Sequence, residues 1–270
     1  MPELPEVETT VRGLARVIDG QRLVHVRANR ADLRRSFPPD LIQAMTGSTV
    51  TGLGRRAKYG LIHTDRGRTL IFHLGMSGRW RIDPEHPDKH DHLVLETGSG
   101  HLLALNDPRR FGSVDLADTD ALDRWPIFQA MGPEPLGPDF TPRQLHQALE
   151  GRKAAIKLML LDQRIVAGLG NIYVCEALNR AGIAPSKPAG GISKPAFARL
   201  VPAIQSVLAE AIAAGGSTIR DYAQPDGKLG YFAKDWRVYG REGQPCPCGG
   251  TVERFAQGGR STFWCRSCQG

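Results

Sequence analysis

Residues 2–18, PELPEVETTVRGLARVI, decide how the N-terminal half of the chain can be interpreted. Apolar residues recur there at the spacing that lines one face of an α-helix: Leu4, Val7, Val11, Leu14 and Ile18. Pro2 and Pro5 fit only in a first helical turn, where backbone N–H groups have no helical partner. The acidic residues suit the positive end of a helix dipole: Glu3, Glu6 and Glu8. The stretch predicts an amphipathic helix that begins at the second residue.

Residues 21–116 contain short apolar or alternating runs that are separated by Gly, Asp, Asn and Pro. The runs are RLVHVRA, STVTGL, YGLIHT, TLIFHLG, HLLALN and SVDL. Their regular spacing is typical of strands in a β-sandwich or a β-barrel.

A Pro- and Gly-rich stretch, MGPEPLGPDFTP (131–142), indicates a domain boundary. Beyond it we expect helices over 142–150, 153–166 and 171–180. A longer helix follows, with one apolar face: Phe197, Leu200, Val201, Ile204, Val207, Leu208 and Ala211. Residues 215–235 are polar and Gly-rich, which predicts a loop of the length that is usually functional or disordered.

The formal net charge of +7 over 270 residues suits a polyanionic partner, although many basic enzymes have none. Composition is globular, with 41% hydrophobic and 23% charged residues. No basic run followed by an apolar stretch opens the chain, as a secretory signal requires. The apolar stretches look too short to cross a bilayer, so we expect no membrane partner.

Four of the five cysteines lie close together near the C-terminus: Cys246, Cys248, Cys265 and Cys268. Two close pairs of thiolates match a structural zinc site, because Zn²⁺ prefers four tetrahedral ligands of this kind. The alternatives are a disulfide pair or free thiols. The first pair is C-x-C, one residue shorter than the usual C-x-x-C. Cys175 stands apart and is interpreted as a small buried hydrophobe.

Three clusters that pair cations or an apolar residue with turn glycines fall in the strand-rich half: RRAKYG (55–60), HLGMSG (73–78) and NDPRRFG (106–112). Charge runs are usually solvated surface. Against that interpretation, Met76 and Phe111 are apolar residues in turn-like segments, beside a cation, and would suit insertion into a base stack.

Three further motifs each have two interpretations. Gly258 and Gly259 predict a tight turn that directs Arg260 outward, either to a phosphate or to solvent. GLGN (168–171), with Asn171 as helix cap, is an anion-binding corner or a plain connection between helices. KHDH (89–92) is a metal site or, as is commoner, a polar loop.

Taken together, these motifs resemble the bacterial formamidopyrimidine-DNA glycosylase family, and the resemblance spans the whole chain. PELPEVET, RRAKY, HLGMSG, KHDH, DPRRFG, MGPEPL, GNIY, QPDGKLGYF and the four-cysteine finger occur in the order of the family. The sister family, endonuclease VIII, typically has Gly after the first Glu, where this chain has Leu4.

The resemblance implies an α+β fold in four parts. An N-terminal helix and β-sandwich span 1–130, and a linker spans 131–141. A helix–two-turn–helix domain spans 142–235, and a zinc-finger β-hairpin spans 236–270. Within this arrangement, residues 217–232 correspond to a flexible cover over the flipped base.

The implied activity is excision of oxidised purines, namely 8-oxoguanine opposite cytosine and formamidopyrimidines, followed by strand cleavage. Pro2, freed by removal of Met1, would be the nucleophile that forms a Schiff base. Glu3 would transfer protons. Lys58 would serve the first (β) elimination, and Arg260 the second (δ).

The resemblance also implies DNA contacts. Glu6 would line the damage pocket. Met76, Arg109 and Phe111 would fill the gap left by the flipped base, with Arg109 reading the opposite cytosine. Further contacts are His90, Arg152, Lys157 and Asn171. In place of the Lys run of many relatives the chain has GRKAAIK, where Arg152 keeps the charge.

The expected cofactor is one structural Zn²⁺ per chain, without a catalytic metal. The expected partner is damaged double-stranded DNA, bound by a monomer in the bacterial cytoplasm at the nucleoid. Two other functions fit part of the sequence. One is an oxidised-pyrimidine enzyme, which Leu4 and the DPRRF cluster disfavour. The other is a zinc-finger DNA-binding module without chemistry, which leaves Pro2, Glu3, Lys58 and Arg260 unexplained.

Overall fold

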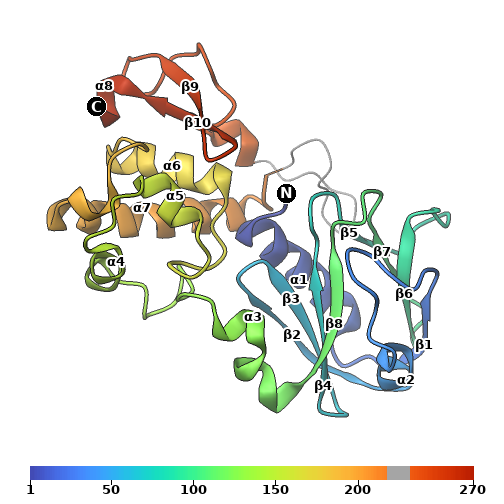
Figure 1. Cartoon of the computed structure of the whole chain (residues 1–270). Helices are drawn as coiled ribbons and strands as arrows, with labels where there is room; N and C mark the ends of the chain where they lie inside the picture. The colour runs from blue at the N-terminus through green and yellow to red at the C-terminus, as the bar shows by residue number, and fades with distance from the viewer. Residues whose placement is uncertain (218–231) are drawn as a thin grey trace. The chain divides into compact units, whose positions relative to one another are not determined.

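The computed structural model describes residues 1–217 and 232–270. These residues belong to two compact units, whose helices and strands are drawn in Figure 1. The first unit comprises Met1–Gln129 and the described residues of Ala214–Tyr231; the second comprises Ala130–Ala213 and Phe232–Gly270. The predicted cover loop, residues 217–232, lies outside the described part of the chain except for its two end residues.

The first unit contains two four-stranded antiparallel sheets, with strand orders β1-β6-β7-β5 and β2-β3-β4-β8. The strands are β1 (Leu23–Ala28), β2 (Val50–Arg56), β3 (Tyr59–Thr64), β4 (Arg68–His73), β5 (Arg79–Ile82), β6 (Asp91–Thr97), β7 (Leu102–Asn106) and β8 (Ser113–Asp118). The helices are α1 (Leu4–Ile18), α2 (Leu41–Met45), the 3-10 helix η1 (Thr119–Arg124) and α3 (Pro126–Gln129). The two separate sheets confirm the sandwich and exclude the barrel.

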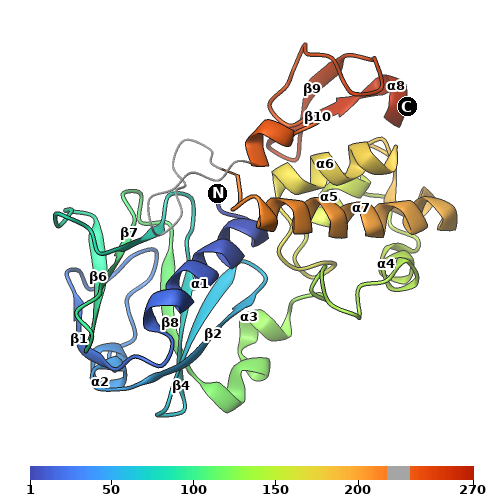
Figure 2. The same ribbon diagram turned by 180° about the vertical axis from the view of Figure 1, so that it is seen from behind.

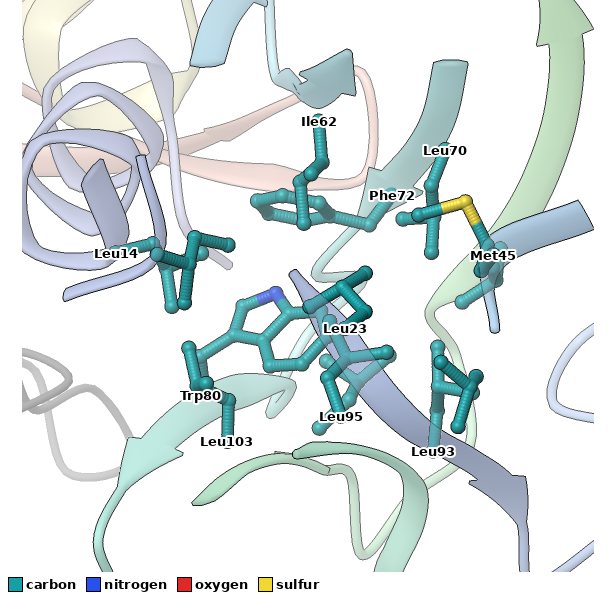
Figure 3. Packing of buried hydrophobic residues seen from close by; sticks show 14 of the residues in the cluster. Leu14, Leu23, Met45, Ile62, Leu70, Phe72, Trp80, Leu93, Leu95 and Leu103 are labelled. Carbon is teal, nitrogen blue, oxygen red and sulfur yellow. The ribbon is translucent and has the colours of Figure 1, made fainter. Parts of the chain in front are cut away.

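Both sheets and α1 bury their apolar faces in one core. Figure 3 shows the indole of Trp80 on β5 among leucines of the same sheet and Leu14 from α1. The Phe72 ring on β4 meets the Trp80 ring edge to face, with centroids 5.6 Å apart and an interplanar angle of 73°. Because this packing takes side chains from both sheets, it fixes the sandwich and holds α1 against β2 and β3 (Figure 2).

Two details of the first unit differ from the sequence expectation. Helix α1 begins at Leu4, so Pro2 precedes the helix instead of starting it. Strands β5 and β6 were not among the predicted runs. β5 has only four residues, and β6 is buried almost continuously instead of alternating, which removes the period-2 signal.

The second unit is helical and carries a C-terminal hairpin. Its elements are α4 (Pro142–Leu149), α5 (Ile156–Leu161), α6 (Asn171–Ala181), η2 (Ala189–Gly191), α7 (Lys194–Ala213), η3 (Phe232–Asp235), β9 (Val252–Gln257), β10 (Arg260–Cys265) and α8 (Arg266–Gln269). Helix α6 packs against α7 and against β10 of the hairpin (Figures 1 and 2). With the sandwich, this unit confirms the α+β fold class.

Two helices of the second unit depart from expectation. α5 is shorter than the predicted 153–166, because the Asp162 carboxylate accepts the Arg164 N–H at 3.0 Å and turns the chain. α7, at 20 residues and mean hydropathy 1.4, is long and apolar enough to cross a membrane, contrary to our estimate from the sequence. Its buried face packs on α4 and α6, as the core helix of a folded domain does.

His73 ends β4 and holds the start of the segment that follows it. Its Nδ1 accepts the N–H of Gly75 at 3.1 Å, and its ring lies 4.8 Å from that of Tyr59. Burial, together with the smaller effect of the charges of Lys58, Arg34 and Arg35, lowers the pKa of His73 to about 4. The ring is therefore neutral at physiological pH.

This burial predicts a pH-dependent stability. An unfolded His73 takes up a proton near pH 6.5, whereas the folded ring does so only near pH 4. The contribution of His73 to the free energy of unfolding is therefore fully present above the unfolded pKa of 6.5. It falls by roughly 3 kcal/mol as the pH drops from 6.5 to 4. Chemical denaturation across this range should show the loss in the wild type, and His73→Gln should lack this component.

The matched control is His86→Gln, since His86 is exposed. It should keep the wild-type slope between pH 4 and 6.5. Parallel pH profiles for the wild type and His73→Gln would contradict the assignment.

Candidate functional site

The start of α1 is closed by two glutamates. Glu3 is the N-cap, and the Glu6 carboxylate accepts the backbone N–H of Glu3 at 2.8 Å in a capping box. The other Glu6 oxygen accepts the N–H of Ser217 at 2.8 Å. Pro2, Glu3 and Glu6 are all buried. These first residues are thus held in the protein interior, whereas the terminal residues of most domains fray.

Lys58 lies in the two-residue turn between β2 and β3, which pair Arg56 with Tyr59. Ala57 before it has φ +53°, a conformation that costs free energy for a residue with a Cβ. The Lys58 side chain is only 7% exposed. The turn therefore holds this cation inside the first unit under backbone strain.

An ion pair connects this turn to α1. Arg55 donates to the Glu8 carboxylate at 2.9 Å and to the Ala57 carbonyl at 2.9 Å. Burial raises the pKa of Glu8, but hydrogen bonds from Arg55 and Arg12 outweigh it and hold the pKa below its ordinary value. Glu8 is therefore ionised at neutral pH, and the pair links α1, which starts directly after Pro2 and Glu3, to the turn of Lys58.

Two segments of the first unit expose large side chains. Met76 is 37% and Phe111 46% exposed, which is rare for apolar residues in the described part of the chain. The Arg109 guanidinium lies over the Phe111 ring, 4.8 Å from its centroid. His90 is half-buried, and its backbone N–H donates to the Asp88 carboxylate at 2.7 Å. The Arg109–Phe111 pair is an exposed combination of a cation and an aromatic ring, of the kind that suits nucleic acid.

In the second unit, the hairpin turn presents Arg260 to solvent. Gln257 pairs with Arg260, and the two glycines between them have φ of +58° and +72°, which confirms the predicted tight turn. Lys157 is fully buried, and its Nζ donates to the Ser261 carbonyl at 3.1 Å and to Thr262 Oγ1 at 2.7 Å. In this conformation the Lys157 ammonium contacts the hairpin and not solvent.

Asn171 holds the same hairpin carbonyl. Its Nδ2 donates to Ser261 O at 2.9 Å, and Gly170, not Asn171, is the N-cap of α6. The predicted role of Asn171 as a cap is therefore wrong.

Arg152, another predicted DNA contact, is exposed between α4 and α5.

The four clustered cysteines bring their sulfurs within 4.8 Å of one another. Cys246 and Cys268 lie 3.9 Å apart, and Cys248 and Cys265 lie 3.5 Å apart. A tetrahedron with Zn–S bonds of about 2.3 Å has sulfurs about 3.8 Å apart, so the donor set fits zinc despite the short C-x-C pair. The structure has no disulfide among its described residues, which argues against that alternative.

Asn179 of α6 adds a contact that the sequence did not suggest. Its Nδ2 lies 3.5 Å from Cys268 Sγ and 3.8 Å from Cys246 Sγ. Amide donors to thiolate sulfurs offset the negative charge of an all-cysteine site. Among the described residues, only the four cysteines cluster at metal-binding distance, so KHDH gains no support as a metal site.

Comparison with known proteins gives a consistent result. A family model described as the formamidopyrimidine-DNA glycosylase N-terminal domain matches residues 1–114, and one for the H2TH domain of the same enzyme matches residues 131–223. The formamidopyrimidine-DNA glycosylases of Novosphingobium aromaticivorans and Zymomonas mobilis are 72% and 53% identical, with complete coverage of both chains.

Solved structures agree. The MutM (Fpg) protein of Thermus thermophilus is 40% identical with a TM-score of 0.89, covering 99% of this chain and 98% of that one. A Lactococcus lactis Fpg mutant in complex with Fapy-dG-containing DNA is 35% identical with a TM-score of 0.92, covering 99% of both chains. The chain therefore belongs to the formamidopyrimidine-DNA glycosylase family.

Proposed function

We propose that this protein is a bifunctional DNA repair glycosylase that removes oxidised purines and then cleaves the abasic strand. Family membership supports glycosylase action on damaged DNA, and relatives have been solved with Fapy-dG and with abasic-site DNA. The proposed lesions are 8-oxoguanine opposite cytosine and formamidopyrimidines. The proposed form is a monomer in the bacterial cytoplasm, associated with the nucleoid.

One observation carries the proposal most directly. Pro2, Glu3 and Lys58 are all buried within the first unit. The Glu8–Arg55 pair connects α1, which starts directly after Pro2 and Glu3, to the turn of Lys58. An amine, a carboxyl group and an ammonium group held in this way are the components of covalent amine catalysis.

The first step is a displacement at the sugar. After Met1 is removed, the Pro2 amine attacks C1′, and the bond from C1′ to the base breaks with its electrons leaving on the base. A terminal amine has a pKa of about 7.7–8.0, so an appreciable neutral fraction exists near pH 7. We assign Glu3 to proton transfer during base departure and sugar opening.

Elimination follows from the iminium that forms between Pro2 and C1′. The iminium accepts electrons, so a C2′ proton is lost and the 3′ phosphate leaves; a second elimination releases the 5′ phosphate. We assign Lys58 to the first elimination and Arg260 to the second, where a guanidinium suits phosphate geometry. Lys157 and Asn171 support the strand that begins at Arg260.

For DNA binding, we assign Met76, Arg109 and Phe111 to the gap left by the extruded base, because the base must leave the stack for chemistry. Glu6 is assigned to the damage pocket. Backbone contacts are assigned to His90, Arg152, Lys157 and Asn171. Of these, Lys157 would have to release the hairpin to reach a phosphate itself.

We further propose that the four cysteines hold one structural Zn²⁺ and that no catalytic metal takes part. The metal would tie the segment before β9, which carries Cys246 and Cys248, to the end of β10 and to α8, which carry Cys265 and Cys268. It would supply folding energy, since a unit this small has little core of its own. Neither elimination needs it, because the reacting groups are organic amines and acids.

Borohydride trapping tests the nucleophile. Borohydride reduces an iminium and fixes protein to DNA, so a duplex with 8-oxoguanine opposite cytosine should give an adduct that maps by mass to Pro2. A preparation that retains Met1 is the matched control, and it should bind DNA without trapping because its Pro2 nitrogen is an amide. Tight binding without an adduct at a processed terminus would favour the binding module.

Arg260→Gln tests the division of the two eliminations. Loss of a charged hydrogen bond to phosphate should slow the second elimination by about ten- to a hundred-fold, so that the β-elimination product accumulates. Arg254→Gln, on the neighbouring exposed strand, should give wild-type products. Equal product ratios in both variants would contradict the role of Arg260.

Metal analysis tests the zinc site. The purified wild type and Cys175→Ala should each carry about one zinc per chain, whereas Cys248→Ser should carry far less, since three thiolates hold the ion more weakly. Elemental analysis by mass spectrometry gives the readout. Full zinc in Cys248→Ser, or none in the wild type, would refute the assignment.

A further inference from the structure

Asp107 is a fully buried carboxylate at the base of the segment that carries Arg109 and Phe111. Its Oδ1 accepts the Ser77 hydroxyl at 2.7 Å, and its Oδ2 accepts the Gly112 N–H at 2.8 Å. A buried carboxylate is costly unless it is hydrogen-bonded. The bond from Gly112 closes the segment 107–112, since it joins the first residue to the last, and the bond from Ser77 anchors the segment to a different part of the chain.

Ser77 carries the connection to a second segment. Its Oγ accepts the backbone N–H of Arg109 at 3.3 Å while its hydroxyl donates to Asp107. Ser77 follows Met76 directly in the chain. One hydroxyl thus joins the segment of Met76 to the segment of Arg109.

The two segments also touch through their backbones. A Cβ on Gly75 would lie 2.3 Å from the carbonyl carbon of Phe111, and Gly75 has φ +60°. A Cβ on Gly112 would lie 2.7 Å from the His73 carbonyl oxygen and 3.1 Å from Asp107 Oδ2. Only glycine permits this approach, so the segments pack as one body.

The backbone of Asp107 reaches a third element. Its N–H donates to the His90 carbonyl at 3.0 Å, and its carbonyl lies 3.0 Å from His92 Nε2. Asp107 is thus hydrogen-bonded to His90 itself, to Ser77 next to Met76, and to Gly112 next to Phe111. Arg109 lies two residues away in the same segment. These four are the first-unit residues assigned to DNA contact outside the damage pocket: Met76, His90, Arg109 and Phe111.

We infer that Ser77 and Asp107 form a clamp that presets Met76, Arg109 and Phe111 as one rigid wedge and thereby sets the preference for cytosine opposite the lesion. The inference rests on the proposed function for the wedge itself. Asp107 is fully buried and Ser77 is 7% exposed, so both act through the residues they hold. They are positioning residues, and their contribution is preorganisation.

Ser77→Ala tests the clamp, because it removes the hydroxyl and leaves the volume nearly unchanged. The measurement is equilibrium binding to a duplex that carries a tetrahydrofuran abasic analogue opposite either cytosine or adenine. This analogue cannot react, so the readout does not depend on Pro2. We expect the affinity ratio of cytosine to adenine to fall about five-fold, the size of one lost hydrogen bond.

Three companion measurements separate positioning from general damage. Ser99→Ala removes a hydroxyl from an exposed turn and should keep the wild-type ratio. Asp107→Asn, which can still accept from Gly112 N–H and pair with Ser77, should fall between wild type and Ser77→Ala. The salt dependence of binding should be unchanged in Ser77→Ala, since it reports phosphate contacts and not the wedge.

A second readout distinguishes failure of the clamp from failure of the proposed chemistry. Borohydride trapping on a single-stranded abasic oligonucleotide needs no wedge and should be equal in Ser77→Ala and wild type. If the wild type binds with a cytosine preference but does not trap, the chemistry fails and the binding test of the clamp stands. An unchanged preference in Ser77→Ala, or no preference in the wild type, overturns the clamp.

Discussion

The first unit depends on a carboxylate at the start of α1. Glu6 accepts the N–H of Glu3 with one oxygen and the N–H of Ser217 with the other. The first backbone N–H groups of a helix have no partners within the helix, and at a buried helix start they need another acceptor. By satisfying them internally, Glu6 lets the first residues of the chain occupy the interior. A proposed nucleophile at Pro2 requires this kind of restraint.

A similar physical device recurs at three other places in the described structure. In each, a buried charged side chain makes hydrogen bonds to backbone groups of another part of the chain or of its own segment. Lys157 holds the strand of Arg260, and Asp107 holds the segment of Arg109. Glu176 of α6 accepts three consecutive backbone N–H groups, at residues 237–239. Such groups repay their desolvation only when every bond is made, so each favours one local geometry over its alternatives.

How much could be predicted from the sequence depends on how far apart along the chain the interacting residues lie. Helices α1 and α7 carry period-3.6 apolar patterns, and the paired cysteines carry their own spacing, so both were predicted from local sequence. The partners of Ser77 and Glu8 lie tens of residues away, at Asp107 and Arg55. No local pattern encodes such pairs. Strand β6 was missed for a different reason, because burial on both faces removes the alternation that marks a strand.

The rotation of α1 about its own axis, relative to the sandwich, limits how the gene can change. Each added residue turns a helix by about 100°, so an insertion or deletion within Leu4–Ile18 would rotate everything before it away from its bonds. The buried face of the helix, from Val7 to Ile18, fixes the rotation against the sandwich. Point substitutions on the exposed side, as at Arg12, leave this relation intact. The number of residues between Pro2 and Ile18 should therefore stay constant, even where the exposed side of the helix accepts substitutions.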